Sequence, residues 1–175
     1  MKPAQDNIAY IDGANLYRGV KDLGWVLDYA RFRIWLREKY GVTIAYLFIG
    51  LVPKYKDLYT DLQRAGYVLV FKETTINGEG IPKGNCDADL VLRAARDVFE
   101  TTYGSAVLVS SDGDYACLVS FLQEKKKMRA VLSPHTKCSI LLKRTNVPIT
   151  YLDSVRGHVQ KSAQKEKAPD ADRTA

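Results

Sequence analysis

Four aspartates occur in three separate segments of the chain, in settings that suit a shared metal site. Asp12 lies in IDGAN, Asp87 in GNCDADL, and Asp112 and Asp114 in SSDGDY. Carboxylates that lie close together raise one another's pKa values, and a bound divalent cation removes this cost. Ligands that are all oxygen favour hard ions such as Mg²⁺ or Mn²⁺. Such ions activate water and stabilise developing charge on phosphate. The residues therefore predict metal-dependent hydrolysis of a phosphodiester.

Apolar and amphipathic segments alternate along the chain, which predicts strands separated by helices. Strands are expected over residues 7–12, 42–52, 67–71, 106–111, 129–133 and 149–152. Helices are expected over residues 29–40, 54–65, 86–103, 115–126 and 138–145, and a polar loop over 72–84. This alternation indicates an α/β fold with three layers, α/β/α, around a mostly parallel and doubly wound central sheet. The first strand is expected near the centre of the sheet.

The predicted fold brings the four aspartates to one edge, because the carboxyl ends of parallel strands lie together. Asp12 closes the first strand, Asp112 and Asp114 follow the strand at 106–111, and Asp87 opens the helix that leaves the third strand. Each residue alone also has a local explanation as a helix cap, a turn residue or a partner of a helix dipole. Their convergence favours the shared site. Asp89 is rotated away from it and is expected to pair with Arg93 on the exposed face of the helix.

Composition limits the other possibilities. The 175 residues are 46% hydrophobic, enough for one domain over residues 1–155, and residues 156–175 are expected to form a polar tail without fixed structure. A membrane span needs about 20 apolar residues, and no such run or signal peptide occurs, so we expect a soluble, cytoplasmic protein. The net charge of +6 favours a polyanionic partner. Three widely spaced cysteines indicate neither a zinc site nor a disulfide framework.

Three longer segments resemble a known family when taken together. IDGANLY, KGNCDADLVLRAARD and VLVSSDGDYACLVSFLQEK, in this order, resemble the NYN domain family and specifically its LabA-like bacterial branch, within the PIN-like nucleases. The resemblance extends over residues 7–153. It implies a parallel α/β/α fold and divalent-metal-dependent cleavage of RNA.

The resemblance also implies roles for individual residues. The family's acidic, metal-binding and catalytic positions fall on Asp12, Asp87, Asp112 and Asp114. Its motif asparagine falls on Asn15, which is expected to orient Asp12 or to contact the substrate. Ser110 matches the serine at the strand end, and Lys83 with Gly84 matches the basic entry to the helix; both Ser110 and Lys83 are expected to bind the substrate. Many relatives carry a further acidic residue where this chain has Arg93. This difference puts a second metal ion in question and favours contact of Arg93 with the substrate backbone.

Basic and aromatic side chains near the aspartates are candidates for substrate contact. Those expected near the acidic edge are Arg18, Lys21, Lys83, Arg93 and Arg96. The lysine-rich segment at 125–129 falls at the opposite edge and is not assigned to the site. Tyr17 and Tyr115 follow motif aspartates and could stack a base, with core packing as the alternative for both.

The function that these patterns predict is a Mg²⁺- or Mn²⁺-dependent ribonuclease, endonucleolytic rather than exonucleolytic, acting on single-stranded or structured RNA. RNA rather than DNA rests on the resemblance. The alternative is a non-catalytic module that binds RNA or protein and keeps a vestigial acidic site. A nucleotide-binding Rossmann protein is disfavoured because neither GxGxxG nor GxxxxGK[ST] follows any predicted strand. A homo-oligomer is compatible with the sequence.

Overall fold

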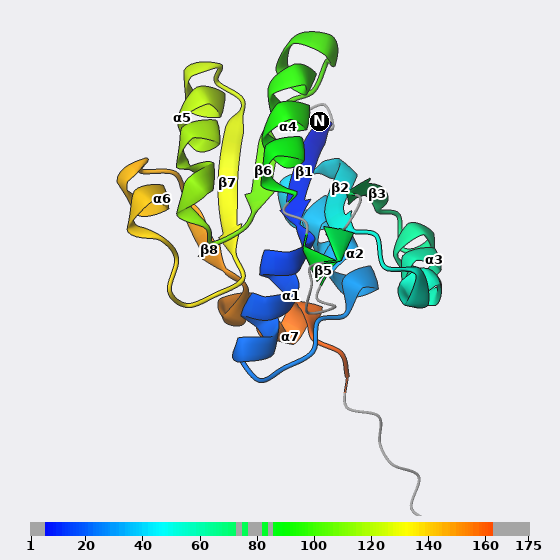
Figure 1. The fold of residues 1–175 in the computed structure, drawn as a ribbon. Helices are drawn as coiled ribbons and strands as arrows, with labels where there is room; N and C mark the ends of the chain where they lie inside the picture. Colours follow the sequence, from blue (N-terminus) through cyan, green and yellow to red (C-terminus); the bar gives the residue numbers. More distant parts are fainter. Residues whose placement is uncertain (1–5, 73–74, 77–81, 84–85, 163–175) are drawn as a thin grey trace, which may run out of the picture.

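The computed structural model describes residues 6–72, 75–76, 82–83 and 86–162, and describes no side chain within 73–85. Its centre is a six-stranded sheet in which every pair of neighbouring strands is parallel (Figure 1). The strands are β1 (Asn7–Asp12), β2 (Val42–Gly50), β3 (Val68–Lys72), β6 (Ala106–Val109), β7 (Met128–Ser133) and β8 (Ile149–Tyr151). The predicted α/β class is confirmed.

The direction of winding reverses beside the first strand. The order across the sheet is β3-β2-β1-β6-β7-β8, so the chain winds outward from β1 through β2 and β3 and later returns to its other side. The expected position of the first strand near the centre is confirmed. β1 and β6 pair up to Ile11 and Val109, and the segments that follow them leave the sheet at the same edge. In open α/β sheets this switch point is where ligands bind.

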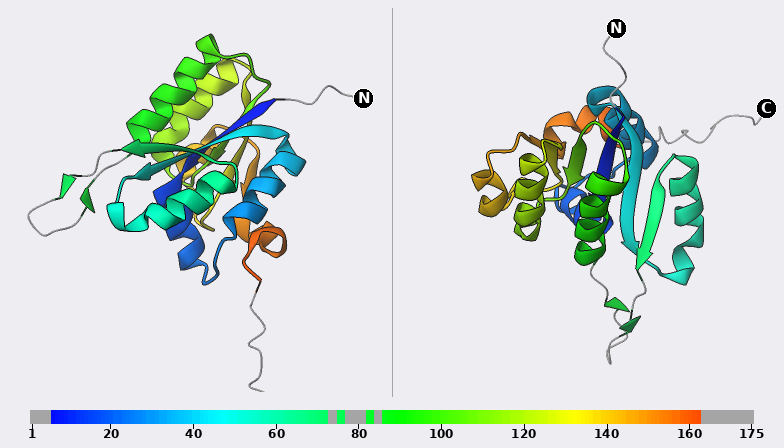
Figure 2. Two further views of the ribbon diagram at one scale, coloured as in Figure 1. Left: turned by 90° about the vertical axis from the view of Figure 1, so that its right-hand side faces the viewer. Right: turned by 90° about the horizontal axis from the view of Figure 1, so that it is seen from above.

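Helices cover both faces of the sheet (Figure 2). One face carries α1 (Gly13–Asp22), α2 (Tyr29–Tyr40), α3 (Lys56–Arg64) and α7 (Arg156–Val159). The other carries α4 (Asp87–Glu100), α5 (Ala116–Glu124) and α6 (Ile140–Arg144). Along β1, Ala9 and Ile11 pack into the first core while Ile8 and Tyr10 pack into the second. This alternation is typical of a strand buried on both faces, and the three-layer α/β/α prediction is confirmed.

Some elements were not expected from the sequence. The segment after β1 forms α1, and the region predicted as a loop contains an antiparallel pair, β4 (Thr75–Ile76) and β5 (Pro82–Lys83). Glycines weaken the helical signal of α1, yet the packing requires them. A Cβ atom on Gly13 would lie 2.8 Å from the carbonyl oxygen of Phe48, and one on Gly19 would lie 2.9 Å from the carbonyl carbon of Pro134. Glycine thus allows α1 to pack closely against its neighbours.

The folded chain extends past the expected domain boundary at residue 155. α7 occupies residues 156–159, Val159 is fully buried, and its carbonyl oxygen accepts a hydrogen bond of 2.8 Å from the backbone N–H of Asp28. Residues 163–175 of the expected tail lie outside the described residues. Among the helices that the structure describes, none is both long and apolar enough to cross a membrane.

Candidate metal centre

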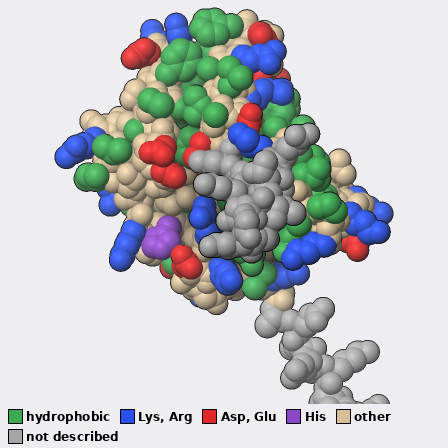
Figure 3. Space-filling model, in the orientation of Figure 1, with side chains coloured by type: hydrophobic (Ala, Val, Ile, Leu, Met, Phe, Trp, Pro, Cys, Tyr) green, Lys and Arg blue, Asp and Glu red, His purple; other side chains and the backbone are tan. Residues whose placement is uncertain are grey.

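The carboxyl ends of β1 and β6 and the start of α4 bring the motif aspartates to one edge of the sheet. Asp12 is the last residue of β1 and the N-cap of α1. Asp112 and Asp114 lie in the turn between β6 and α5, which includes the short 3-10 helix η2 (Gly113–Tyr115). Asp87 is the first residue of α4. Figure 3 shows acidic side chains gathered on this face of the molecule, with lysine and arginine side chains around them.

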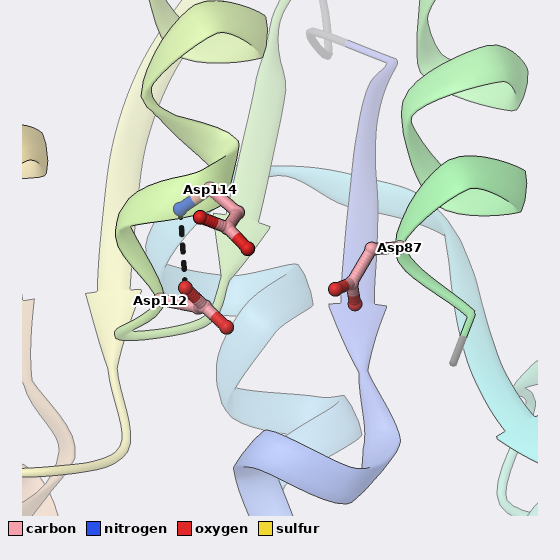
Figure 4. A group of neighbouring side chains, drawn as sticks. All are labelled: Asp87, Asp112 and Asp114. Atoms are coloured by element: carbon pink, nitrogen blue, oxygen red, sulfur yellow. Dashed lines mark hydrogen bonds between the residues drawn. The ribbon is translucent and has the colours of Figure 1, made fainter. Parts of the chain in front are cut away.

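Three of the carboxylates converge on one point. Asp87, Asp112 and Asp114 each offer an oxygen atom within 4.8 Å of the oxygen atoms of the other two. In Figure 4 the side chain of Asp87 reaches from α4 toward the two aspartates of the β6–α5 turn. Asp87 and Asp112 are half-buried and Asp114 is exposed, so the site opens to solvent on one side. A set of three carboxylates with an open side fits a hard divalent cation that keeps several waters.

The turn itself fixes two of these carboxylates. The backbone N–H of Asp114 donates to Oδ1 of Asp112 over 3.1 Å. The backbone N–H of Asp112 donates to Oγ of Ser110 over 3.2 Å, and Ser110 is fully buried. Ser110, predicted to bind substrate, therefore supports the turn in this structure.

Asp12 lies beside this group and is connected to it by Tyr115. Asp12 is 7% exposed, and its Oδ1 accepts a hydrogen bond of 3.0 Å from the backbone N–H of Asn15. The hydroxyl of Tyr115 lies 3.2 Å from Oδ2 of Asp12 and 2.6 Å from Oδ1 of Asp87. A hydroxyl has one hydrogen to donate, so the shorter contact with Asp87 is the stronger bond. Tyr115 thus holds two carboxylates from different elements at a fixed separation.

The electrostatics of Asp12 and Tyr115 follow from burial next to negative charge. Burial raises the pKa of Asp12, and the charge of Asp87 raises it further, while the N–H of Asn15, the hydroxyl of Tyr115 and the charge of Arg18 act in the opposite direction. Burial also raises the pKa of Tyr115, and the carboxylates of Asp12 and Asp87 add to this shift. Tyr115 therefore remains protonated and able to donate. A cation at this edge would offset the repulsion between the carboxylates.

Asn15 connects α1 to the end of β6. Its side-chain oxygen accepts hydrogen bonds from the backbone N–H of Ser111 over 2.9 Å and from Ser111 Oγ over 3.0 Å. Its backbone N–H holds Asp12, as described above. The residue is half-buried and thereby joins the two central segments of the site.

The predicted basic contacts differ in their surroundings. Arg18 is exposed on the first turns of α1, and its Nε donates to the carbonyl oxygen of Ala14 over 3.3 Å. Its charge is close enough to Asp12 to lower the pKa of that carboxyl. The backbone of Lys83 belongs to β5, while its side chain and Gly84 lie outside the described part of the chain.

Arg93 has internal partners. Its Nε lies 2.9 and 3.0 Å from the two carboxylate oxygens of Asp97, and its guanidinium also contacts the hydroxyl and the ring face of Tyr46. Asp97 is 3% exposed and accepts a further bond of 2.9 Å from the hydroxyl of Tyr10. The expected pair between Asp89 and Arg93 does not form, because the carboxylate of Asp89 pairs with Lys72 at 3.0 Å.

Tyr115 is the residue of this site whose role the sequence did not indicate. Its side chain is fully buried, so it packs in the core and cannot stack on a base, whereas Tyr17 is 59% exposed. The sequence feature that could have indicated this role is the position of Tyr115 directly after Asp114. A tyrosine that is buried near the end of a strand needs a polar partner for its hydroxyl.

Comparison with known proteins identifies the family and the fold of the chain. The profile of the NYN domain family matches residues 8–151. The crystal structure of a protein of unknown function from Vibrio parahaemolyticus superposes with a TM-score of 0.74 at 21% identity, over 92% of this chain and 99% of that one. At this identity the likeness concerns the fold. No curated protein sequence matches the chain.

Proposed function

The chain belongs to the NYN domain family, and we propose that it is a divalent-metal-dependent endoribonuclease. The observation that carries the proposal is the convergence of Asp87, Asp112 and Asp114 at the switch point of a parallel sheet. A nucleic acid would be repelled by clustered carboxylates alone. The carboxylates can take part in cleaving a phosphodiester only if a cation lies between them and the phosphate. RNA as the substrate, and the LabA-like branch within the family, rest on the motifs discussed above.

Each residue of the site has a proposed role. Asp87, Asp112 and Asp114 would hold Mg²⁺ or Mn²⁺, and Asp12 adds a fourth carboxylate at the same edge. The bound ion would supply an activated water and neutralise charge on the phosphate. Tyr115 and the backbone of Asn15 keep Asp87 and Asp12 in place. Arg18 is proposed to contact the substrate backbone.

Arg93 and Lys83 remain weaker proposals for substrate contact. The guanidinium of Arg93 is already paired with Asp97. Its side chain is nevertheless 40% exposed, which leaves room for a phosphate contact. Asn15 and Ser110 have internal partners, so we propose that they act by positioning the aspartates.

Cleavage of defined RNAs tests this function. Linear single-stranded, hairpin and circular single-stranded RNA are incubated with the protein in Mn²⁺, in Mg²⁺ and in EDTA. We expect cleavage only with metal, and cleavage of the circle identifies an endonuclease. Asp87→Asn and Asp112→Asn should each reduce the rate more than about 100-fold, because even outer partners of a metal site are worth 10- to 100-fold.

The matched control is Asp61→Asn, which removes an exposed carboxylate on α3 that pairs with the exposed Arg64. This variant should cleave as fast as the unmodified protein. Folded protein that binds RNA in EDTA and cuts none of the three substrates would overturn the nuclease proposal. That outcome would favour the non-catalytic RNA-binding module.

A further inference from the structure

A pocket of about 330 Å³ opens beside α1, on the helix that begins at Asp12. Tyr17 and Lys21 of α1 line the pocket, together with Trp25, Leu27 and Tyr29 from the segment that follows. Tyr17 lies five residues after Asp12, a rise of about 7.5 Å along the helix axis. In Figure 1, α1 lies just beyond the arrowhead of β1, so the pocket and the acidic edge share one element.

The walls of the pocket combine flat apolar surface with positive charge. Tyr17 is 59% exposed, and Nζ of Lys21 lies 5.9 Å from the centroid of its ring. Trp25 and Leu27 also line the pocket and are each 6% exposed, so they contribute apolar surface that is held in the core. An exposed aromatic ring with a lysine beside it suits a base that stacks and a phosphate that follows it.

The nearby carboxylates have partners of their own. Asp28 accepts a bond of 3.1 Å from the backbone N–H of Arg31 at the start of α2. Asp153 accepts a bond of 3.1 Å from Nε1 of Trp25. Arg156 lies 6.0 Å from the Trp25 ring and adds a further cation to this side of the molecule. Among the described residues that line the pocket itself, Lys21 carries the charge, so the lining favours an anionic ligand.

We propose that this pocket holds an unpaired base of the single-stranded nucleic acid whose phosphate lies at the acidic edge. The proposal rests on the proposed nuclease function, and it adds that the strand must be unpaired beside the cleavage site. The base stacks on Tyr17, and Lys21 with Arg18 contacts the flanking phosphates. Since ring faces and aliphatic side chains dominate the walls, the pocket accepts any base by stacking and does not read sequence.

Binding in EDTA tests the pocket separately from cleavage. A fluorescently labelled, unstructured single-stranded RNA of mixed sequence is titrated with the protein, and the dissociation constant is taken from anisotropy. Tyr17→Ala should raise this constant about tenfold, as expected for the loss of one stacked base. Tyr17→Phe keeps the ring and should stay within about twofold. The matched control is Tyr55→Ala, since Tyr55 is 45% exposed, has Lys54 Nζ 4.9 Å from its ring centroid, and does not line the pocket.

Abasic substitutions in the RNA locate the stacked base. One abasic position should weaken binding as much as Tyr17→Ala does, and the two changes should not add, because they remove the same contact. If neither Tyr17→Ala nor any abasic position changes the affinity, the proposal is overturned. A change of oligomeric state in Tyr17→Ala with unchanged RNA affinity would also overturn it and assign the pocket to a second copy. Tyr17-dependent binding without cleavage in Mn²⁺ would support the pocket while refuting the nuclease.

Discussion

The hydroxyl of Tyr115 donates a hydrogen bond of 2.6 Å to Oδ1 of Asp87, joining the turn after β6 to the first residue of α4. The two residues are 28 positions apart in the sequence. The same hydroxyl is 3.2 Å from Asp12 at the end of β1. One buried side chain thus sets the spacing between carboxylates that come from separate elements. Outer partners of this kind orient the ligands of a metal site.

Replacement of Tyr115 by phenylalanine is expected to weaken metal binding without unfolding the protein. The ring still fills its buried position, but Asp87 loses the donor that fixes it. We expect a 10- to 100-fold loss in apparent affinity for Mn²⁺. The cleavage rate should recover at least in part at saturating Mn²⁺. The measurement is the dependence of the cleavage rate on Mn²⁺ concentration, together with isothermal titration calorimetry.

Tyr67→Phe is the matched control for this substitution. Tyr67 is also buried, and its hydroxyl donates a bond of 2.8 Å to the backbone oxygen of Tyr29, away from the aspartates. This variant should lose about 1 kcal/mol of stability and keep its response to Mn²⁺. An equal loss of metal affinity in both variants would show that any lost tyrosine hydroxyl loosens the site.

Removing the charge of Asp12 is expected to stabilise the metal-free protein at neutral pH. Because burial raises the pKa of Asp12 in the folded state, the folded protein holds its proton more tightly than the unfolded chain does. The free energy of unfolding therefore falls as the pH rises from about 4 through the pKa of the folded state. The cost is therefore larger at neutral pH than at pH 4. Asp12→Asn removes it, and asparagine keeps the oxygen that caps α1.

Thermal unfolding in EDTA measures this effect. We expect Asp12→Asn to melt a few degrees higher than the unmodified protein at pH 7, a change on the order of 1 kcal/mol. The difference should shrink toward pH 4. Adding Mn²⁺ at about 100 times its dissociation constant should stabilise the unmodified protein by about 2.7 kcal/mol and Asp112→Asn much less. A lower melting temperature for Asp12→Asn in EDTA would contradict the pKa direction.

Much of the fold was predictable because the buried strands of the sheet are continuous apolar runs. The segment at residues 7–12 coincides with β1, and the expected helix at 29–40 coincides with α2. The elements that were missed depend on their neighbours for stability. α1 contains glycines that its close packing requires, and β4 and β5 have two residues each. α7 is a single helical turn whose Val159 side chain is buried in the core.

The residues of the candidate site could be predicted where their place in the sequence puts them at the carboxyl edge of the sheet. Asp87, Asp112 and Asp114 meet because the ends of parallel strands share an edge, which a sequence pattern can indicate. The partners of Arg93 and the bridging role of Tyr115 depend on contacts between distant segments. An aromatic residue after a strand usually packs in the core, so its sequence position did not indicate that its hydroxyl would join two carboxylates.

The cysteines provide a test of the surroundings of the acidic edge. Cys86 precedes Asp87, and burial together with the charges of Asp12 and Asp89 raises its pKa to about 11. At pH 8 about one Cys86 side chain in a thousand is the reactive thiolate. Cys117 is exposed, while Cys138 is buried. We expect iodoacetamide to modify Cys117 first, Cys86 slowly, and Cys138 only after unfolding.

Peptide mass spectrometry at several pH values measures these rates. The rate at Cys86 should rise about tenfold per pH unit between pH 8 and 10, since the thiolate fraction rises in proportion. A rate at Cys86 that levels off near pH 9 would show that its pKa is not raised.

Arg93→Met is expected to lower the stability of the protein more than it lowers the rate of RNA cleavage. The substitution leaves the buried carboxylate of Asp97 with the hydroxyl of Tyr10 and without its cation. We expect the free energy of unfolding to fall by about 2 kcal/mol, which is typical of a lost hydrogen bond to a charged group. The loss should not be larger, because Arg93 is partly solvated and water weakens its interaction with Asp97. Urea unfolding measures the stability, and cleavage is assayed well below the melting temperature.

Arg96→Met is the control on the same helix, because Arg96 forms an exposed pair with Glu100. It should change stability by less than about 0.5 kcal/mol. If Arg93→Met keeps its stability and raises KM for RNA several-fold, Arg93 contacts the substrate backbone as its sequence position suggested. If stability falls and KM is unchanged, the main role of Arg93 is to neutralise Asp97, and the contacts with substrate phosphates come from other basic residues such as Arg18 and Lys21 of α1.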